Sequence, residues 1–188
     1  MKEMEYKFLV TKEKFYEIMK ALKEKYPDAA DMERVQINYY YDTDDNYLLN
    51  NNTTLRVRQI EDRITLELKE SIVAANDFST SNETIKPIDI LTGDITLSEG
   101  RHAWIPFKMQ GNLVTRRYSL KPSSSLSIDF DINCYFGFCD YEIEMEFTDN
   151  AKKATSILVK NLDLMQYKNR IGGKSRRFFA RKSGTFKE

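Results

Sequence analysis

Charged and apolar residues alternate at every second position in five stretches of this 188-residue chain. The first stretch, Glu3-Met4-Glu5-Tyr6-Lys7, carries an acid, an acid and a base at a spacing of two. Successive side chains of a β-strand point to opposite faces, so the three charged groups would share one face. Carboxylates beside basic side chains suit a hard cation such as Mg²⁺ that binds together with phosphate groups. The spacing therefore indicates a strand face that holds ions.

The alternation returns in four later stretches, at 55–58, 64–69, 128–132 and 141–147. Alternation alone fits two placements of the charged residues. They could lie on the solvent-exposed face of a half-buried sheet, or they could line a barrel whose lumen binds a highly charged ligand. Taken by itself, alternation favours the solvent-exposed face. Like charges such as Arg56 and Arg58, or Glu142 and Glu144, repel along a strand unless a partner or ligand neutralises them. This repulsion argues for the lumen.

Composition limits the classes of partner. The chain has 29 basic and 29 acidic residues and a net charge of zero, so we expect neither nucleic acid nor a membrane as partner. No apolar run approaches the roughly 20 residues of a membrane span, and the charged N-terminus lacks a signal peptide's apolar stretch. We expect a cytoplasmic protein with one domain over residues 1–188.

The cysteines and the histidine narrow the chemistry. Cys134 and Cys139 lack the spacing of a redox pair and are expected to be reduced thiols. His102 is the sole histidine and is expected to be a loop or packing residue. A nitrogen or sulfur metal site is therefore hard to build, which leaves carboxylate oxygens and, with them, Mg²⁺ or Mn²⁺.

The remaining pattern predicts an antiparallel α+β fold of about eight strands and two clear helices. One helix follows an N-cap at Thr11, with an apolar face of Phe15, Ile18, Met19, Leu22 and Tyr26. A second opens near 149–150, with Ala154, Ile157, Leu158 and Leu162 on one face. Glu61 and Asp62 separate two strands of a hairpin. Further strands are expected at 34–42, 79–85, 113–120 and 175–180, and residues 71–112 are otherwise weakly patterned, with room for a short helix.

The opening Glu3-x-Glu5-x-Lys7 resembles the signature of the CYTH superfamily, the triphosphate tunnel metalloenzymes, which include class IV adenylate cyclases, thiamine triphosphatases and inorganic triphosphatases. Further blocks follow in family order at 36–43, 55–58, 66–69, 131–137, 140–144 and 174–178. The resemblance implies an eight-stranded antiparallel closed β-barrel, or tunnel, with a charged lumen and flanking helices.

The resemblance also implies roles for individual residues in binding a triphosphate with Mg²⁺ or Mn²⁺. The metal ligands would be Glu3, Glu5, Asp131, Glu142 and Glu144. The triphosphate-binding residues would be Lys7, Arg56, Arg58, Lys69, Arg117, Lys174 and Arg177. The catalytic residues would be Glu5, Glu144 and Lys7.

Some correspondences stay open. Arg117 is preferred over Arg116 as the inward arginine, and Asp129 shares the parity of Asp131. Arg177 is either a phosphate ligand or a solvated charge. Glu67 could simply pair with a neighbouring base, and Glu83 matches a family acid within a poorly matching segment.

The leading functional hypothesis is metal-dependent hydrolysis of inorganic tripolyphosphate or an organic triphosphate by a monomer or homodimer. One alternative is a class IV-type adenylate cyclase, which would release cyclic AMP and pyrophosphate from ATP. Another is a non-catalytic module that binds polyphosphate or a nucleotide.

Overall fold

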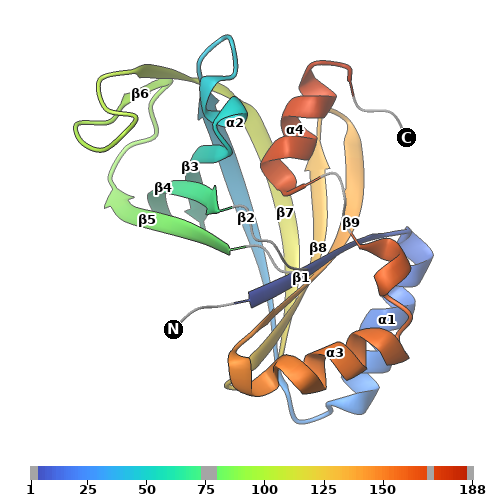
Figure 1. Ribbon diagram of the computed structural model, residues 1–188. Helices are drawn as coiled ribbons and strands as arrows, with labels where there is room; N and C mark the ends of the chain where they lie inside the picture. The colour runs from blue at the N-terminus through green and yellow to red at the C-terminus, as the bar shows by residue number, and fades with distance from the viewer. Residues whose placement is uncertain (1–3, 73–79, 169–171, 186–188) are drawn as a thin grey trace.

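The computed structural model describes residues 4–72, 80–168 and 172–185, which form one large, strongly curved antiparallel sheet with helices on its convex side and at one end (Figure 1). The sheet has nine strands, in the order β1-β9-β8-β7-β2-β3-β4-β5, and β6 pairs with β7. The strands are β1 (Met4–Val10), β2 (Ala30–Asp42), β3 (Thr53–Ile60), β4 (Arg63–Ile72), β5 (Thr80–Ile88), β6 (Asp94–Thr96), β7 (Pro106–Ser123), β8 (Leu126–Tyr135) and β9 (Phe138–Phe147). The predicted α+β class and antiparallel pairing are confirmed.

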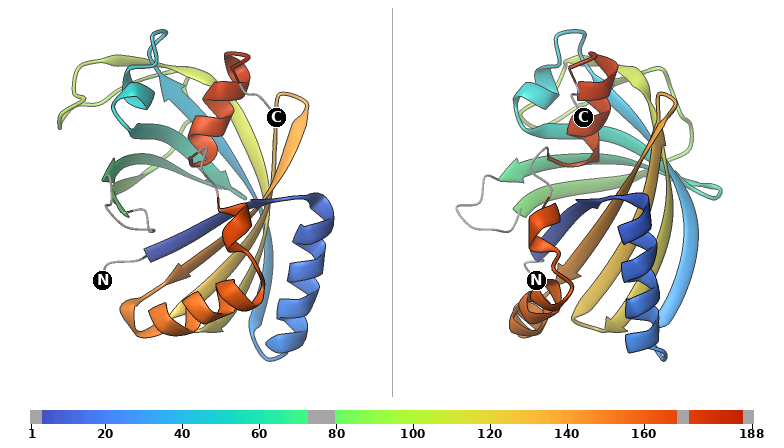
Figure 2. Two further views of the ribbon diagram at one scale, coloured as in Figure 1. Left: turned by 45° about the vertical axis from the view of Figure 1, so that its right-hand side comes forward. Right: turned by 90° about the vertical axis from the view of Figure 1, so that its right-hand side faces the viewer.

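The expected barrel closure is not seen. The path of paired strands starts at β1 and ends at β5, and no ladder joins these two strands in the described ranges. The sheet instead curves around a concave side (Figure 2). Alternation predicts which side chains face inward, but closure depends on strand tilt and stagger, which the pattern does not report.

The helices are α1 (Lys12–Lys25), α2 (Tyr47–Asn50), α3 (Lys152–Asn161) and α4 (Lys174–Lys182), with 3-10 turns η1 (Asp149–Ala151) and η2 (Met165–Tyr167). Helix α1 is confirmed, because the Thr11 side chain accepts a hydrogen bond from the Lys14 amide and the predicted apolar face is buried, apart from Tyr26, which is the partly buried C-cap. The expected start of the second helix at 149–150 falls in η1, and α3 follows it directly. Ala154 and Ile157 are exposed, and the buried residues of α3 are Thr155, Leu158 and Val159. None of the described helices is long and apolar enough to cross a bilayer.

The main hydrophobic core lies on the convex side of the sheet. Alternate residues of β1, such as Tyr6 and Phe8, pack with β8, β9, α1 and α3, and Phe8, Phe15 and Ile143 are fully buried. Because the period of a strand is two, burying Tyr6 and Phe8 sends Glu5 and Lys7 to the concave side. The packing of this core therefore orients the charged face of β1.

The strand expected at 175–180 is wrong, because this segment forms α4. Arg177 and Phe178 follow Lys174 by three and four residues, so the three side chains lie on one face of the helix. Residues 174–178 are also one of the blocks that resemble the CYTH superfamily. Phe178 packs so closely on β7 that a Cβ at Gly111, where φ is 136°, would lie 3.1 Å from its ring. The absence of a side chain at Gly111 therefore leaves room for α4 to pack against β7.

The cysteine expectation is also wrong. Cys134 and Cys139 form a disulfide across the β8–β9 hairpin, with Cα atoms 4.2 Å apart. The turn residues Phe136 and Gly137 both have positive φ, which brings the two cysteines directly opposite in the ladder. Because the two cysteines are bonded to each other, the expectation of reduced thiols no longer supports a cytoplasmic location. His102 is a buried packing residue as expected, with its ring edge-on to Tyr47.

Candidate active site

A cavity of about 360 Å³ lies on the concave side of the sheet and collects most of the predicted charged residues. Its lining draws side chains from seven strands and from the segment that begins α4. The charged lining residues are Glu5, Lys7, Arg56, Arg58, Lys69, Glu83, Arg117, Glu144, Glu146, Lys168, Lys174 and Arg176. The alternating charges therefore converge on one space and do not spread over an outer face.

Strand register brings opposite charges together on the wall formed by β1, β9, β8 and β7, which we call the acidic wall. Lys7 of β1 lies opposite Glu144 of β9, and Arg117 of β7 lies opposite Asp131 of β8. Directly opposed side chains in an antiparallel pair are close enough to interact. The Lys7 Nζ atom lies 2.9 Å from Glu5 and 3.4 Å from Glu144.

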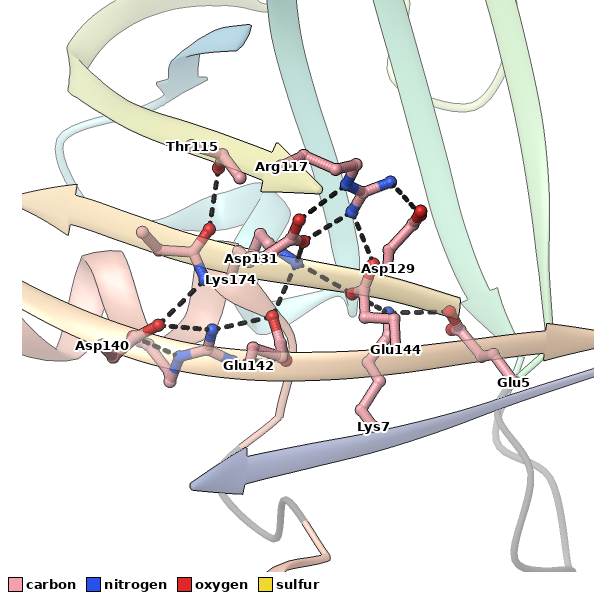
Figure 3. Close-up of polar contacts among 12 residues, drawn as sticks. Glu5, Lys7, Thr115, Arg117, Asp129, Asp131, Asp140, Glu142, Glu144 and Lys174 are labelled. Carbon is pink, nitrogen blue, oxygen red and sulfur yellow. Dashed lines mark hydrogen bonds and ion pairs between the residues drawn. The ribbon is translucent and has the colours of Figure 1, made fainter. Parts of the chain in front are cut away.

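Arg117 is the central base of the acidic wall. Its guanidinium lies 2.6 Å from Asp129, 2.6 Å from Asp131 and 2.7 Å from Glu144 (Figure 3). Burial alone would lower the pKa of Arg117, but Glu144 and Asp131 raise it above its ordinary value. Arg116 points outward to Glu33, so the preference for Arg117 as the inward arginine is confirmed.

The Lys174 ammonium sits among three carboxylates at the deep end of this wall. Its Nζ atom lies 2.9 Å from Asp131, 2.6 Å from Glu142 and 2.8 Å from Glu144 (Figure 3). Burial alone would raise the pKa of Glu142, but Lys174 and then Arg177 lower it to about 2. Both Asp131 and Glu142 are fully buried and outside the lining of the cavity.

Arg177 lies behind the cavity and does not line it. The side chain is fully buried and forms ion pairs with Asp140 at 2.8 Å and with Glu142 at 3.0 Å. Asp140 also accepts hydrogen bonds from Asn133 and Tyr135. The alternative of a solvated charge is therefore wrong, and the side chain anchors α4 to β9.

The opposite wall, formed by β3, β4 and β5, is the basic wall. Glu67 pairs with Arg56 at 2.7 Å and Arg58 at 3.5 Å, which confirms that it can pair with neighbouring bases. Lys69 lies 2.5 Å from Glu83. Burial lowers the pKa of Arg58 to about 10, and the adjacent Arg56 adds to this effect. Positively charged groups therefore face the acidic wall across the cavity.

Glu146 is a cavity residue that the sequence prediction missed. It follows Glu142 and Glu144 on β9 at the same parity, so the alternation itself contained the signal. Its carboxylate forms no hydrogen bond or ion pair with any other residue in the described ranges. Burial, together with Glu144 and Asp129, raises the pKa of Glu146 to about 7.

Two groups of carboxylates have oxygen atoms within 4.8 Å of one another and could hold a metal ion. The inner group is Asp131, Glu142 and Glu144, and the outer group is Asp129, Glu144 and Glu146. Asp129 faces inward as Asp131 does, so both aspartates contribute to the acidic wall. The predicted ligand Glu3 lies outside the described residues.

The chain is similar to known proteins over most of its length. It is 29% identical over 182 residues to a Bacillus subtilis (strain 168) protein named "Putative triphosphatase YjbK", covering 90% of this chain and 92% of the relative. A crystal structure of a "putative adenylate cyclase" from Bacillus halodurans is 26% identical and has a TM-score of 0.71, covering 95% of this chain and all of that one.

The same architecture occurs in HpAC1 from Hippeastrum, which is described as a "putative adenylyl cyclase" with a dominant triphosphatase activity. That structure is 19% identical, has a TM-score of 0.69, and covers 97% of this chain and 96% of its own. A family model for the CYTH domain matches residues 1–170. The strand order, the charged cavity and this match lead to one conclusion: the chain belongs to the CYTH domain family.

Proposed function

We propose that the protein is a metal-dependent hydrolase that cleaves a phosphoanhydride bond of a triphosphate in this cavity. The observation that carries the proposal is the meeting of an acidic wall and a basic wall around one space of about 360 Å³. A phosphate chain needs cationic side chains along its length, and a divalent cation bound to it needs carboxylates nearby. The two walls supply both.

The basic side chains hold the substrate in this proposal. Arg56 and Arg58 present planar guanidinium forks to phosphate oxygens, and Lys69 adds a compact charge farther along β4. Lys7, Arg117 and Lys174 approach from the acidic wall, where their ion pairs hold them in place. The phosphate chain would thereby be fixed between the walls, which lowers the entropic cost of reaching the reactive geometry.

The outer carboxylate group would hold Mg²⁺ or Mn²⁺. Its donors are oxygens, which hard cations prefer, and Glu146 has a carboxylate unpaired within the described residues. Glu5 lies opposite Glu146 in the β1–β9 ladder and would add another oxygen. When bound, the cation would neutralise charge on the phosphate oxygens and make the phosphorus more susceptible to attack.

Glu5, Glu144 and Lys7 would complete the catalytic arrangement. Burial alone would lower the pKa of Lys7, but Glu144 and Glu5 raise it, so the ammonium stays charged and can donate to a phosphate oxygen. The Glu5 carboxylate, 2.9 Å from Lys7, would accept a hydrogen bond from water and orient it. Water forms the new P–O bond, the anhydride P–O bond breaks, and the surplus proton leaves to solvent.

Adenylate cyclase is the second candidate, since the Bacillus halodurans relative carries that name. Cyclisation of ATP requires the base and ribose to be held in a defined orientation. The described lining residues include no aromatic side chain that could stack on adenine. This feature favours hydrolysis, and we expect phosphate and a diphosphate product in place of cyclic AMP.

The test is a product screen with purified protein. Tripolyphosphate, thiamine triphosphate and ATP would each be incubated with Mg²⁺, Mn²⁺ or Ca²⁺, and phosphate, pyrophosphate and cyclic AMP quantified. We expect metal-dependent phosphate release that falls at least about 100-fold in Glu5→Gln, the scale of losing one preorganised group. Absence of turnover with every pair would refute the hydrolase, and tight binding without product would identify a binding module.

A further inference from the structure

The inner carboxylate group has a cation of its own. The Nζ atom of Lys174 lies within 3 Å of Asp131, Glu142 and Glu144, one oxygen from each residue of the group that could otherwise hold a metal ion. We propose that this ammonium is a resident cation that keeps divalent metal out of the inner group and confines it to the outer group. The proposal rests on the proposed function only for the identity of the outer site.

The local charges support a filled inner group. Asp131 and Glu142 have fully buried side chains, and the Lys174 side chain is only 10% exposed. Arg117 contacts Asp131 and Glu144, and Arg177 contacts Glu142, so each carboxylate of the group has a second base besides the ammonium. A divalent ion among these oxygens would face a buried ammonium at contact distance, where poor screening makes repulsion strong.

The position of Lys174 is set by the carboxylates and by the anchoring of α4. A cation in the first turn of a helix opposes the helix dipole, so helix preference does not explain a lysine at the start of α4. One turn later, Arg177 binds Asp140 and Glu142 and donates to the Gly172 carbonyl at 3.1 Å. These contacts hold the start of the helix against β9 and keep the ammonium among its three partners.

The outer group contrasts with the inner one. Arg117 pairs with Asp129 and Glu144 of the outer group, but no ammonium lies among its three carboxylates in the described residues. Glu146 lines the cavity and is unpaired among the described residues, whereas both oxygens of Glu142 contact bases. The proposal therefore removes Asp131 and Glu142 from the predicted metal ligands and gives them the role of holding α4. It also adds Glu146 to the ligands.

The experiment compares Lys174→Met with the wild type and with Lys182→Met, a matched change on the exposed end of the same helix. Mn²⁺ bound per chain would be measured by equilibrium dialysis with metal analysis. We expect Lys174→Met to bind one more Mn²⁺ than the wild type and Lys182→Met to bind the same number. Equal Mn²⁺ counts in Lys174→Met and the wild type would overturn the proposal.

Lys174→Met leaves three carboxylates without their ammonium partner, which weakens folding. A stability measurement keeps the proposal testable if the variant folds poorly. At Mn²⁺ about 100-fold above its dissociation constant, the extra site should add roughly 5–10 °C to the melting temperature gained by the wild type. If the variant folds only with Mn²⁺, its recovery supports the proposal. If Mn²⁺ fails to rescue the variant, the proposal is wrong.

Lys174→Arg gives a further check, because guanidinium keeps a cation in the inner group. We expect its Mn²⁺ count to equal that of the wild type, and an extra ion would count against the proposal. The wild-type count tests the outer site of the proposed function, whereas the difference between Lys174→Met and wild type tests this inference. The two can therefore fail separately.

Discussion

Glu146 gives the sharpest test of the electrostatics of the cavity. Burial, Glu144 and Asp129 raise its pKa from 4.5 to about 7. Between these values the folded protein holds a proton that the unfolded chain releases, so this contribution to stability is complete below pH 4.5 and lost as pH rises through 7. Since a tenfold change in proton affinity is worth about 1.4 kcal/mol, this rise of the pKa from 4.5 to about 7 corresponds to about 3 kcal/mol.

Glu146→Gln has a neutral side chain at every pH and should escape this loss. Without metal, we expect the wild type to lose about 3 kcal/mol more stability than the variant between pH 4.5 and 8.5, or roughly 6–12 °C in melting temperature. The assay is thermal unfolding by circular dichroism in chelator at several pH values. Glu24→Gln, a change on the exposed face of α1, is the control and should follow the wild type.

Mn²⁺ supplies the second half of this test. A divalent cation at the outer group would replace the proton, so Mn²⁺ at pH 8 should stabilise the wild type more than Glu146→Gln. Parallel pH curves for the two proteins in chelator would refute the assignment of a destabilising ionised carboxylate at this position. Equal stabilisation by Mn²⁺ would refute its role as a ligand.

Other changes test the walls and the docking of α4. Arg117→Met leaves buried carboxylates without their base and should cost about 3–5 kcal/mol in urea unfolding, and a smaller loss than 1 kcal/mol would contradict the buried ion pairs. Gly111→Ala places a Cβ 3.1 Å from Phe178 at a φ of 136°, so we expect a loss of about 1–3 kcal/mol in urea unfolding, and unchanged stability would show that the helix shifts freely. Lys69→Met removes a proposed phosphate contact and should lower kcat/KM by about 10- to 100-fold, the usual range for a charged hydrogen bond, whereas Arg116→Met, whose side chain pairs with Glu33 outside the cavity, should match the wild type. Equal kinetics in these two variants would count against the basic wall.

The sequence reveals which charges face inward more reliably than how deep they lie. Period-two alternation correctly predicts that Lys7, Arg58 and Glu144 share the concave face, because the convex face must bury the intervening apolar residues. Alternation carries no information on depth along that face. The family resemblance, which assigns Glu142 to the metal and Arg177 to the triphosphate, gives no depth either, and both residues lie outside the cavity lining, paired with each other.

The segment at the start of α4 illustrates a second limit. The short charged run that ends in Phe178 and Phe179 satisfies both a strand period and a helix period. Contacts distant in sequence select the helix, namely the packing of Phe178 and the ion pairs of Arg177. The disulfide is not predicted for a similar reason, because the sequence pattern does not report the conformation of the turn. Cys134 and Cys139 are five positions apart in the sequence, and only the tight turn between them brings the sulfur atoms together.

The open path of the sheet has a mechanical consequence. Within the described ladders, the acidic and basic walls are connected through the long pairing of β7 with β2, while the edge strands β1 and β5 remain unjoined. The spacing between the walls is thus set by the curvature of that ladder and by the start of α4, where Ser175 contacts Thr54 of β3 at 2.8 Å. A change of width would therefore have to break the α4 contact as well as bend the ladder, so α4 acts as a brace across the cleft.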